Sequence, residues 1–274
     1  MRHALTPLMI LSALLWGCGG RDVPADEGTG SPLDGVDARA SASTAEPRVG
    51  RQGSPEDRLR VVFLGTSLTA GLGLEDPAVE SWAARVAERA RDEGYPVALV
   101  NAGVSGDTSA GGLRRLDWLL REPVDVLVVE LGANDGLRGL SLDELASNLR
   151  EIIRRTREAW PGARIVLAGM EAPPNLGEEY VEGFRSVFLD VARTENTGRI
   201  PFLLEGVAAV PRLNQADGIH PTAAGHARMA ETAWPAVEAA LKAREDVGAA
   251  GPSRDGLSGR TDPESPNQEA TWHS

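Results

Sequence analysis

The chain of 274 residues carries 28 Lys and Arg against 40 Asp and Glu, a formal net charge of −12. This acidic balance argues against DNA or RNA as the main partner, because binding to phosphates requires a basic face, so we expect no nucleic-acid partner. A single cysteine excludes an internal disulfide framework and a zinc ribbon, and 4% aromatic residues argue against a base-stacking platform. The hydrophobic content of 42% is enough for a core of domain size.

The first segment, residues 1–17, is typical of a signal peptide. Arg2 precedes an apolar run from Leu8 to Trp16, which is shorter than the roughly 18–20 residues that cross a bilayer. The run ends in Leu-Trp-Gly-Cys at Cys18, which resembles a bacterial lipobox, where cleavage precedes a cysteine that is then lipidated. We therefore expect a lipid anchor on Cys18 and a location in the bacterial cell envelope, at the periplasmic face or the cell surface. An ordinary secretory signal with a chance cysteine is the alternative.

Two flanking segments, 18–58 and 244–274, are rich in Gly, Ser, Pro, Ala and acidic residues and show no apolar periodicity. Composition of this kind predicts disorder, so we interpret the first segment as a tether and the second as a tail. Residues 59–243 have the length of a single domain, which we expect to be a monomer.

Within this domain, short apolar runs alternate with helical patterns. The runs are rich in Val, Ile and Leu and predict strands at 59–64, 97–100, 124–131, 164–168 and 200–204. Helical periodicity predicts helices at 79–93, 111–120, 142–160, 178–194 and 222–243. Near-continuous apolar strands separated by helices indicate an α/β fold, with a five-stranded parallel sheet between two layers of helices.

Polar, glycine-rich turns follow four of these elements, at 65–71, 101–105, 132–136 and 217–221. Ligands of such sheets bind beyond the carboxyl ends of the strands, so we expect these turns to meet at one edge. Their residue types suit acyl transfer, which needs a nucleophile, a base, a group that orients the base and donors for an oxyanion.

The domain contains two histidines, and His220 is the candidate base because Asp217 lies three residues before it in a tight turn. The carboxylate can then hold one ring nitrogen while the other accepts a proton from a serine. The other histidine, His226, has no comparable acidic neighbour, and we interpret it as a partly buried helix residue. Ser67 is the candidate nucleophile, although an N-cap serine is the simpler explanation of its position taken alone.

The remaining turns supply candidate donors for the oxyanion. Gly103 has no side chain to obstruct its amide, and Asn134 offers a side-chain NH₂. Either residue alone is common in turns, but each follows its own strand in the order that a shared site requires.

These blocks resemble the SGNH (GDSL) hydrolase family, which is named for a Ser, Gly, Asn and His in separate blocks. The four residues here are Ser67, Gly103, Asn134 and His220, and Asp217 completes the pattern. The segments around 132–139, 174–180 and 217–221 are similar to the bacterial branch of thioesterases, arylesterases and lysophospholipases. Thr66 departs from the family, which has Asp before the nucleophile.

The resemblance implies a flavodoxin-like three-layer fold and a serine esterase that needs no cofactor and no metal. Ser67 would attack an ester or thioester with His220 as base and Asp217 holding the imidazole. The Ser67 amide, the Gly103 amide and the Asn134 side chain would form the oxyanion hole. The substrate pocket would include Leu137, Pro174 and Leu176, whose apolar character favours a medium or long acyl chain in a small ester or lipid substrate.

Other functions remain as alternatives. A carbohydrate O-acetyl esterase of the same fold is one, and a catalytically silent surface lipoprotein that only binds a ligand is another. A flavin- or phosphate-binding module is a third, although the chain has no P-loop motif and its Gly71-Leu72-Gly73 lacks a third glycine. The domain has two histidines, and one of them is the candidate base. The sequence therefore offers too few ligands for a zinc site.

Overall fold

The computed structural model describes residues 58–250. The predicted signal peptide, the tether, Cys18 and residues 251–274 lie outside the described residues. No helix in the described part of the chain combines the length and the apolar character needed to cross a membrane.

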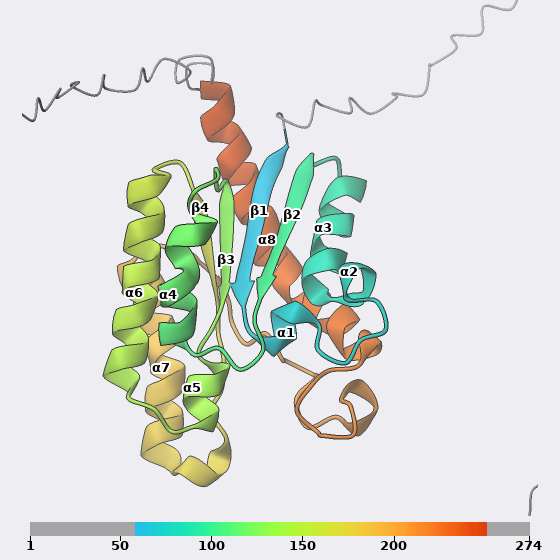
Figure 1. Ribbon diagram of the computed structural model, residues 1–274, viewed down its shortest axis with the longest axis vertical. Coiled ribbons are helices and arrows are strands. Elements are labelled where there is room, and N and C mark those ends of the chain that lie inside the picture. Colours follow the sequence, from blue (N-terminus) through green and yellow to red (C-terminus); the bar gives the residue numbers. More distant parts are fainter. Residues whose placement is uncertain (1–57, 251–274) are drawn as a thin grey trace, which may run out of the picture. The chain divides into compact units, whose positions relative to one another are not determined.

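The centre of the domain is a five-stranded parallel sheet with the order β2-β1-β3-β4-β5 (Figure 1). Its strands are β1 (Leu59–Gly65), β2 (Val97–Gly103), β3 (Val126–Glu130), β4 (Arg164–Ala168) and β5 (Gly198–Ile200). Every residue of β3 is buried, as expected for a central strand with helices on both faces. The α/β fold with a flavodoxin-like sheet is confirmed.

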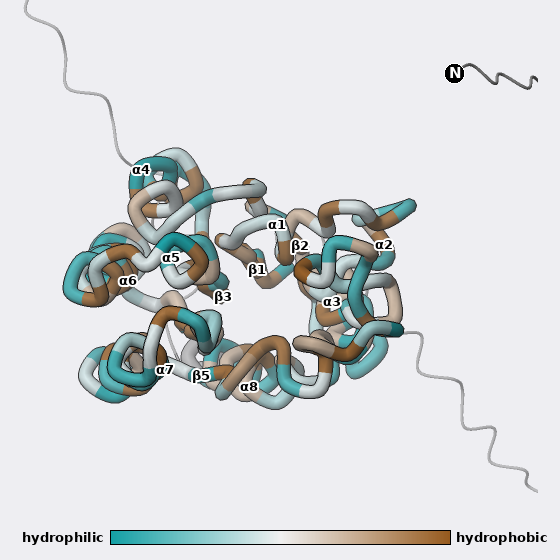
Figure 2. The backbone as a smooth tube through the Cα atoms, turned by 90° about the horizontal axis from the view of Figure 1, so that it is seen from below, coloured by the Kyte–Doolittle hydropathy of each residue, from teal (hydrophilic) through white to brown (hydrophobic). Residues whose placement is uncertain are grey.

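The chain forms eight α-helices within residues 58–250: α1 (Ser67–Ala70), α2 (Pro77–Glu80), α3 (Trp82–Asp92), α4 (Ser109–Leu119), α5 (Ala133–Leu137), α6 (Leu142–Ala159), α7 (Glu178–Thr194) and α8 (Ala223–Ala250). Helices α3 and α8 pack together on one face of the sheet, and α4, α6 and α7 pack on the other (Figure 2). The short helices α1 and α5 lie at the carboxyl ends of the strands (Figure 1). Two 3₁₀ turns, η2 (Pro174–Leu176) and η3 (Pro211–Leu213), lie in the connecting loops.

Three predicted elements differ from the observed ones by more than a shift of up to three residues at an end. The fifth strand was expected at 200–204, but it ends at Ile200 because Pro201 has no N–H to continue the ladder and the chain turns. The helix expected over 79–93 is divided at Ser81, which ends α2 and caps α3 through its side chain. Helix α8 continues to Ala250, beyond the end expected at 243.

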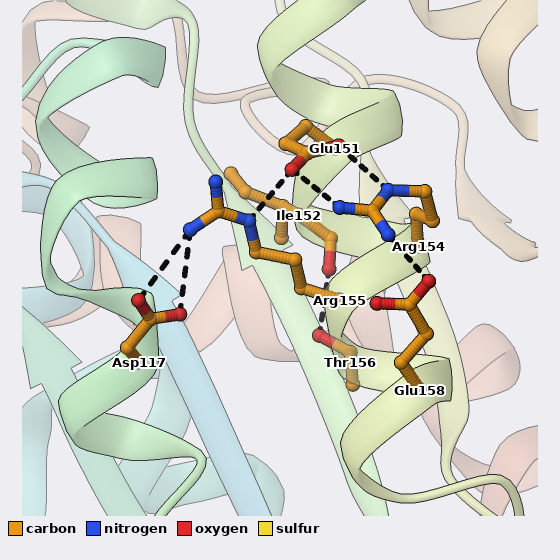
Figure 3. A network of polar contacts seen from close by, with 7 residues as sticks. All are labelled: Asp117, Glu151, Ile152, Arg154, Arg155, Thr156 and Glu158. Carbon is orange, nitrogen blue, oxygen red and sulfur yellow. Dashed lines mark hydrogen bonds and ion pairs between the residues drawn. The ribbon is translucent and has the colours of Figure 1, made fainter.

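The pair Arg154-Arg155 forms part of an ion-pair network on α6, as Figure 3 shows. Glu151 accepts from both guanidinium groups at 2.7 Å, and Arg155 reaches across to Asp117 of α4 at 3.4 Å. Arg154 also pairs with Glu158 one turn further along. These arginines therefore pair with carboxylates of their own helix and with one carboxylate of the neighbouring α4. Exposed pairs of this kind contribute little to stability.

Candidate active site

The nucleophile candidate, Ser67, is the first residue of α1 and follows β1 directly. Thr66 caps this helix, because its side chain accepts from the Leu68 N–H at 3.4 Å. The helix ends at Gly71, whose φ of 73° is a left-handed conformation that favours glycine. This short helix places Ser67 next to the point where the strand order reverses, between β1 and β3.

A chain of hydrogen bonds joins three of the predicted site residues. His220 Nε2 lies 3.0 Å from Ser67 Oγ, and His220 Nδ1 lies 2.6 Å from Asp217 Oδ2. A carboxylate only accepts, so Nδ1 carries the proton and Nε2 is free to accept from the serine hydroxyl. The arrangement can therefore remove the proton of Ser67 during attack on a carbonyl.

Asp217, whose side chain is 45% exposed, is held in its ionised form by hydrogen bonds. The His220 side chain donates to Oδ2, and the backbone N–H groups of Ile219 and His220 donate to Oδ1 at 2.9 and 3.0 Å. The hydrogen bond from the His220 ring, followed by those two backbone N–H groups, holds the pKa of Asp217 well below its usual range. A permanently ionised partner keeps the imidazole in one tautomer.

Gln215 ties the His220 loop to the Ser67 loop. Its backbone N–H donates to the His220 carbonyl at 2.7 Å, and its side-chain Nε2 donates to the Leu72 and Pro221 carbonyls at 2.7 and 2.9 Å. Nothing in the sequence marks this residue as part of the site, because a glutamine in a loop gives no signal of a contact with a residue 143 positions away.

The expected oxyanion donors come together only in part. Ser67 and Asn134 both line the cavity beside His220. The Asn134 side chain donates one amide hydrogen to the Asp107 carbonyl at 2.9 Å, which leaves its second amide hydrogen for a ligand. The Ser67 N–H has no acceptor within residues 58–250.

The structure contradicts the prediction for Gly103. Its N–H donates to Asn101 Oδ1 at 3.0 Å, and the residue does not line the cavity. It is glycine for a packing reason, since a Cβ there would lie 2.1 Å from the backbone nitrogen of Ala70. Gly106, at φ 82°, lines the cavity instead, and its N–H has no acceptor in the described part of the chain. The sequence carries one indication of this role: Gly106 lies between Ser105 and Asp107, in a polar turn close to the second block.

The cavity beside Ser67 has a volume of about 610 Å³. Of the three residues predicted for it, Leu137 and Pro174 line it and Leu176 does not. Leu176 instead packs, partly buried, against the hydrophobic core. Much of the apolar wall comes from positions that the sequence did not identify: Leu72, Met170, Phe202, Leu204 and Ile219.

His226 is buried at 1% exposure, and its Nδ1 accepts from the Trp82 N–H at 3.2 Å. Burial, with nearby Arg85 and His220, lowers its pKa to about 4, so it is neutral at physiological pH. The histidine is thus a structural residue between α8 and α3.

Across residues 58–250, no group of three or more His, Cys, Asp or Glu side chains is arranged to hold a metal ion.

Comparisons with known proteins agree with this architecture. The GDSL-like Lipase/Acylhydrolase family matches residues 63–228. Esterase TesA of Pseudomonas aeruginosa is 45% identical over 182 residues, which cover 66% of this chain and 89% of that protein. Thioesterase 1/protease 1/lysophospholipase L1 of Escherichia coli K12 is 37% identical over 163 residues, which cover 59% and 74% of the two chains.

A solved structure shows the same fold. The crystal structure of TesA has a TM-score of 0.63 and 44% identity, with 66% of this chain and 99% of that chain covered. The chain therefore belongs to the GDSL-like lipase/acylhydrolase family, the SGNH hydrolases, and is an enzyme that hydrolyses ester bonds.

Proposed function

We propose that the enzyme hydrolyses carboxylic esters or thioesters through an acyl-enzyme on Ser67. The observation that carries the proposal is the hydrogen-bonded chain from Ser67 Oγ through His220 to Asp217, at the wall of an apolar cavity. The first bond in this chain joins residues that lie 153 positions apart, and a serine that served only as a helix cap would not need an imidazole partner.

In the proposed reaction, Ser67 Oγ attacks the substrate carbonyl while His220 Nε2 takes the hydroxyl proton. The N–H groups of Ser67 and Gly106, with the Asn134 side chain, donate to the oxyanion that forms. His220 then gives its proton to the leaving alcohol or thiol as that group departs. A water molecule, deprotonated by the same nitrogen, then attacks the acyl-enzyme. The bond between the acyl group and Ser67 Oγ breaks, His220 returns the proton to Oγ, and the carboxylic acid is released.

The cavity wall favours a medium or long acyl chain. Met170, Ala172, Phe202 and Leu204 offer a hydrocarbon chain apolar contact, whereas a sugar would require polar partners there. The names of the similar proteins, an esterase and a thioesterase/lysophospholipase, support this substrate class. A carbohydrate O-acetyl esterase is the less favoured alternative.

We further propose that the enzyme works at a membrane surface, where a lipid on Cys18 would hold it close to lipid-derived esters. The support is the sequence pattern at residues 15–18. An acyl-ester substrate that partitions into a membrane would be concentrated near an anchored enzyme.

The direct test is Ser67→Ala, measured with p-nitrophenyl octanoate and octanoyl-CoA. We expect turnover to fall by about four orders of magnitude or more while thermal unfolding stays unchanged. Ser186→Ala, on the exposed surface of α7, is the matched control and should retain full activity. Equal activity in the wild type and Ser67→Ala would refute the assignment, and a wild type without turnover would favour a binding protein.

A further inference from the structure

A buried carboxylate lies beneath the nucleophile turn. Glu130 is the last residue of β3, the strand beside β1, and its side chain is fully buried. Burying a charge in a protein core is costly unless hydrogen bonds compensate for the lost water. A carboxylate at this position therefore needs a physical reason.

The carboxylate accepts hydrogen bonds from both ends of the turn that carries Ser67. Glu130 Oε2 accepts from the Thr66 N–H at 2.8 Å, and the Thr66 hydroxyl lies 3.0 Å from Oε1. Oε2 also accepts from the Thr69 hydroxyl at 2.8 Å and from the Thr69 N–H at 3.2 Å. These four donors precede and follow Ser67, so the contact fixes the peptide units on both sides of the nucleophile.

Gly65 makes this close approach possible. A Cβ at Gly65 would lie 2.0 Å from Thr69 Oγ1 and 2.6 Å from Glu130 Oε2. The glycine, the two threonines and the glutamate thus form one packed unit. Thr66, which stands where the family has Asp, takes part in it as a donor.

We propose that Glu130 is a positioning residue for the nucleophile: its ionised carboxylate ties the Ser67 turn to strand β3 and thereby fixes the Ser67 hydroxyl and N–H in the cavity. Only an acceptor satisfies four donors, so the ionised form fits this network. A protonated carboxyl group would bring a fifth hydrogen, and one of the donors would have to turn away. The inference rests on the proposed role of Ser67.

The protonation of this group bears on activity near neutral pH. Burial raises the pKa of Glu130 to about 7, although the hydrogen bonds from Thr66 and Thr69 act in the opposite direction. Other charged groups also meet the turn. His220 reaches it through Ser67 Oγ, and Arg115, paired with Asp107, donates to the Gly65 carbonyl at 2.8 Å.

The test compares Glu130→Gln with Asp125→Asn. Asp125 is a second buried carboxylate, just before the opposite end of β3, and accepts from the Arg60 N–H at 2.8 Å. The glutamine keeps the shape but replaces one of the two accepting oxygens with an NH₂ group, which cannot accept from the threonine donors. We expect kcat to fall at least about tenfold with KM within about twofold, because a displaced hydroxyl weakens attack more than binding.

Nucleophile reactivity is measured separately with an alkyl p-nitrophenyl phosphonate. Ser67 forms a bond to phosphorus, its proton passes to His220 and p-nitrophenolate leaves. We expect the rate constant of this reaction to fall in parallel with kcat in Glu130→Gln and to stay at the wild-type value in Asp125→Asn, even where the control lowers the unfolding temperature.

A second variant decides the question if Glu130→Gln does not fold. Thr69→Val keeps the shape of the turn but removes one hydroxyl donor, which disfavours the ionised carboxylate. The acid limb of kcat/KM should then move at least about 0.5 pH units higher, with activity retained at alkaline pH.

Wild-type kcat and phosphonate reactivity in folded Glu130→Gln would overturn the inference, as would an unshifted pH profile in Thr69→Val. The outcomes separate the two proposals. If Ser67→Ala keeps its activity, the proposed function fails; if Ser67→Ala is inactive and Glu130→Gln is fully active, only the role of Glu130 fails.

Discussion

His220 Nε2 lies 3.0 Å from the Ser67 hydroxyl, although 153 residues separate the two in the chain. Ser67 follows β1 and His220 lies in the loop before α8, so the contact depends on both ends of the domain. Because Asp217 holds the other ring nitrogen at 2.6 Å, the imidazole presents its unprotonated nitrogen to the serine.

Asp217→Asn should lower kcat by about 10²- to 10⁴-fold. An amide NH₂ facing Nδ1 favours the tautomer with the proton on Nε2, and that nitrogen can no longer accept from Ser67. The asparagine oxygen can still accept from the N–H groups of Ile219 and His220, so the turn should keep its shape. Steady-state kinetics with circular dichroism as a folding control tests this, and an unchanged kcat would show that Asp217 is dispensable.

Asn134→Ala should lower kcat by about 10²- to 10³-fold with little change in KM, the effect of losing one oxyanion donor. The asparagine keeps one amide hydrogen for this purpose while the other binds the Asp107 carbonyl. Asn148→Ala, which loses a side-chain amide bonded to Ser109 Oγ on α4, is the control. A loss confined to KM would instead assign Asn134 to ground-state binding.

The cavity should select acyl chains by length. In a p-nitrophenyl ester series from C2 to C12, we expect kcat/KM to rise with chain length beyond C2, because each buried CH₂ contributes about 0.8 kcal/mol. Ala172→Phe adds bulk to the apolar wall and should move the preference to shorter chains, with little effect on the C2 ester. A maximum at C2 in the wild type would contradict the acyl-pocket assignment.

His226 should make the fold less stable in acid. Its pKa falls from an ordinary value of 6.5 to about 4 on folding, so the unfolded chain takes up a proton first as the pH drops below 6.5. Between pH 7 and pH 5 this costs about 2 kcal/mol of unfolding free energy. His226→Gln, which keeps an acceptor for the Trp82 N–H, should lose less stability on acidification. Urea unfolding of both proteins at pH 7 and pH 5 measures this difference. Glu130, whose pKa is also shifted, is present in both proteins, so the difference between them reports on the histidine alone.

Cys18 should decide where the enzyme is found. On expression of the full-length precursor in a bacterial host, we expect the wild type in the membrane fraction and Cys18→Ser in the soluble fraction of the envelope or unprocessed. Metabolic labelling with a tagged fatty acid should mark only the wild type. Labelling of both proteins would place the lipid elsewhere, and labelling of neither would favour an ordinary secretory signal.

Local patterns predicted most of the fold correctly. Runs of apolar residues predicted five strands, and four of these strands lie close to their predicted positions. The fifth strand was misplaced because residues 200–204 are apolar enough for a strand, while Pro201 ends the ladder after Ile200. A run of apolar residues indicates burial but not the type of secondary structure. Leu203, in the loop after β5, is buried without belonging to a strand.

The sequence by itself determined the fold class, because apolar runs alternate with helical periodicity along the domain. It also predicted Ser67, His220 and Asp217 as site residues, because Ser67 follows a predicted strand and Asp217 lies three residues before His220 in a tight turn. Only the tertiary structure decided which glycine lines the cavity. Gly103 and Gly106 lie in the same connection, and the hydrogen bond of Gly103 to Asn101 separates their roles. The tertiary structure also revealed Glu130, which has the sequence context of any strand residue. Its four donors belong to Thr66, between β1 and α1, and to Thr69 of α1. Contacts between segments so far apart in the chain leave no local sequence pattern.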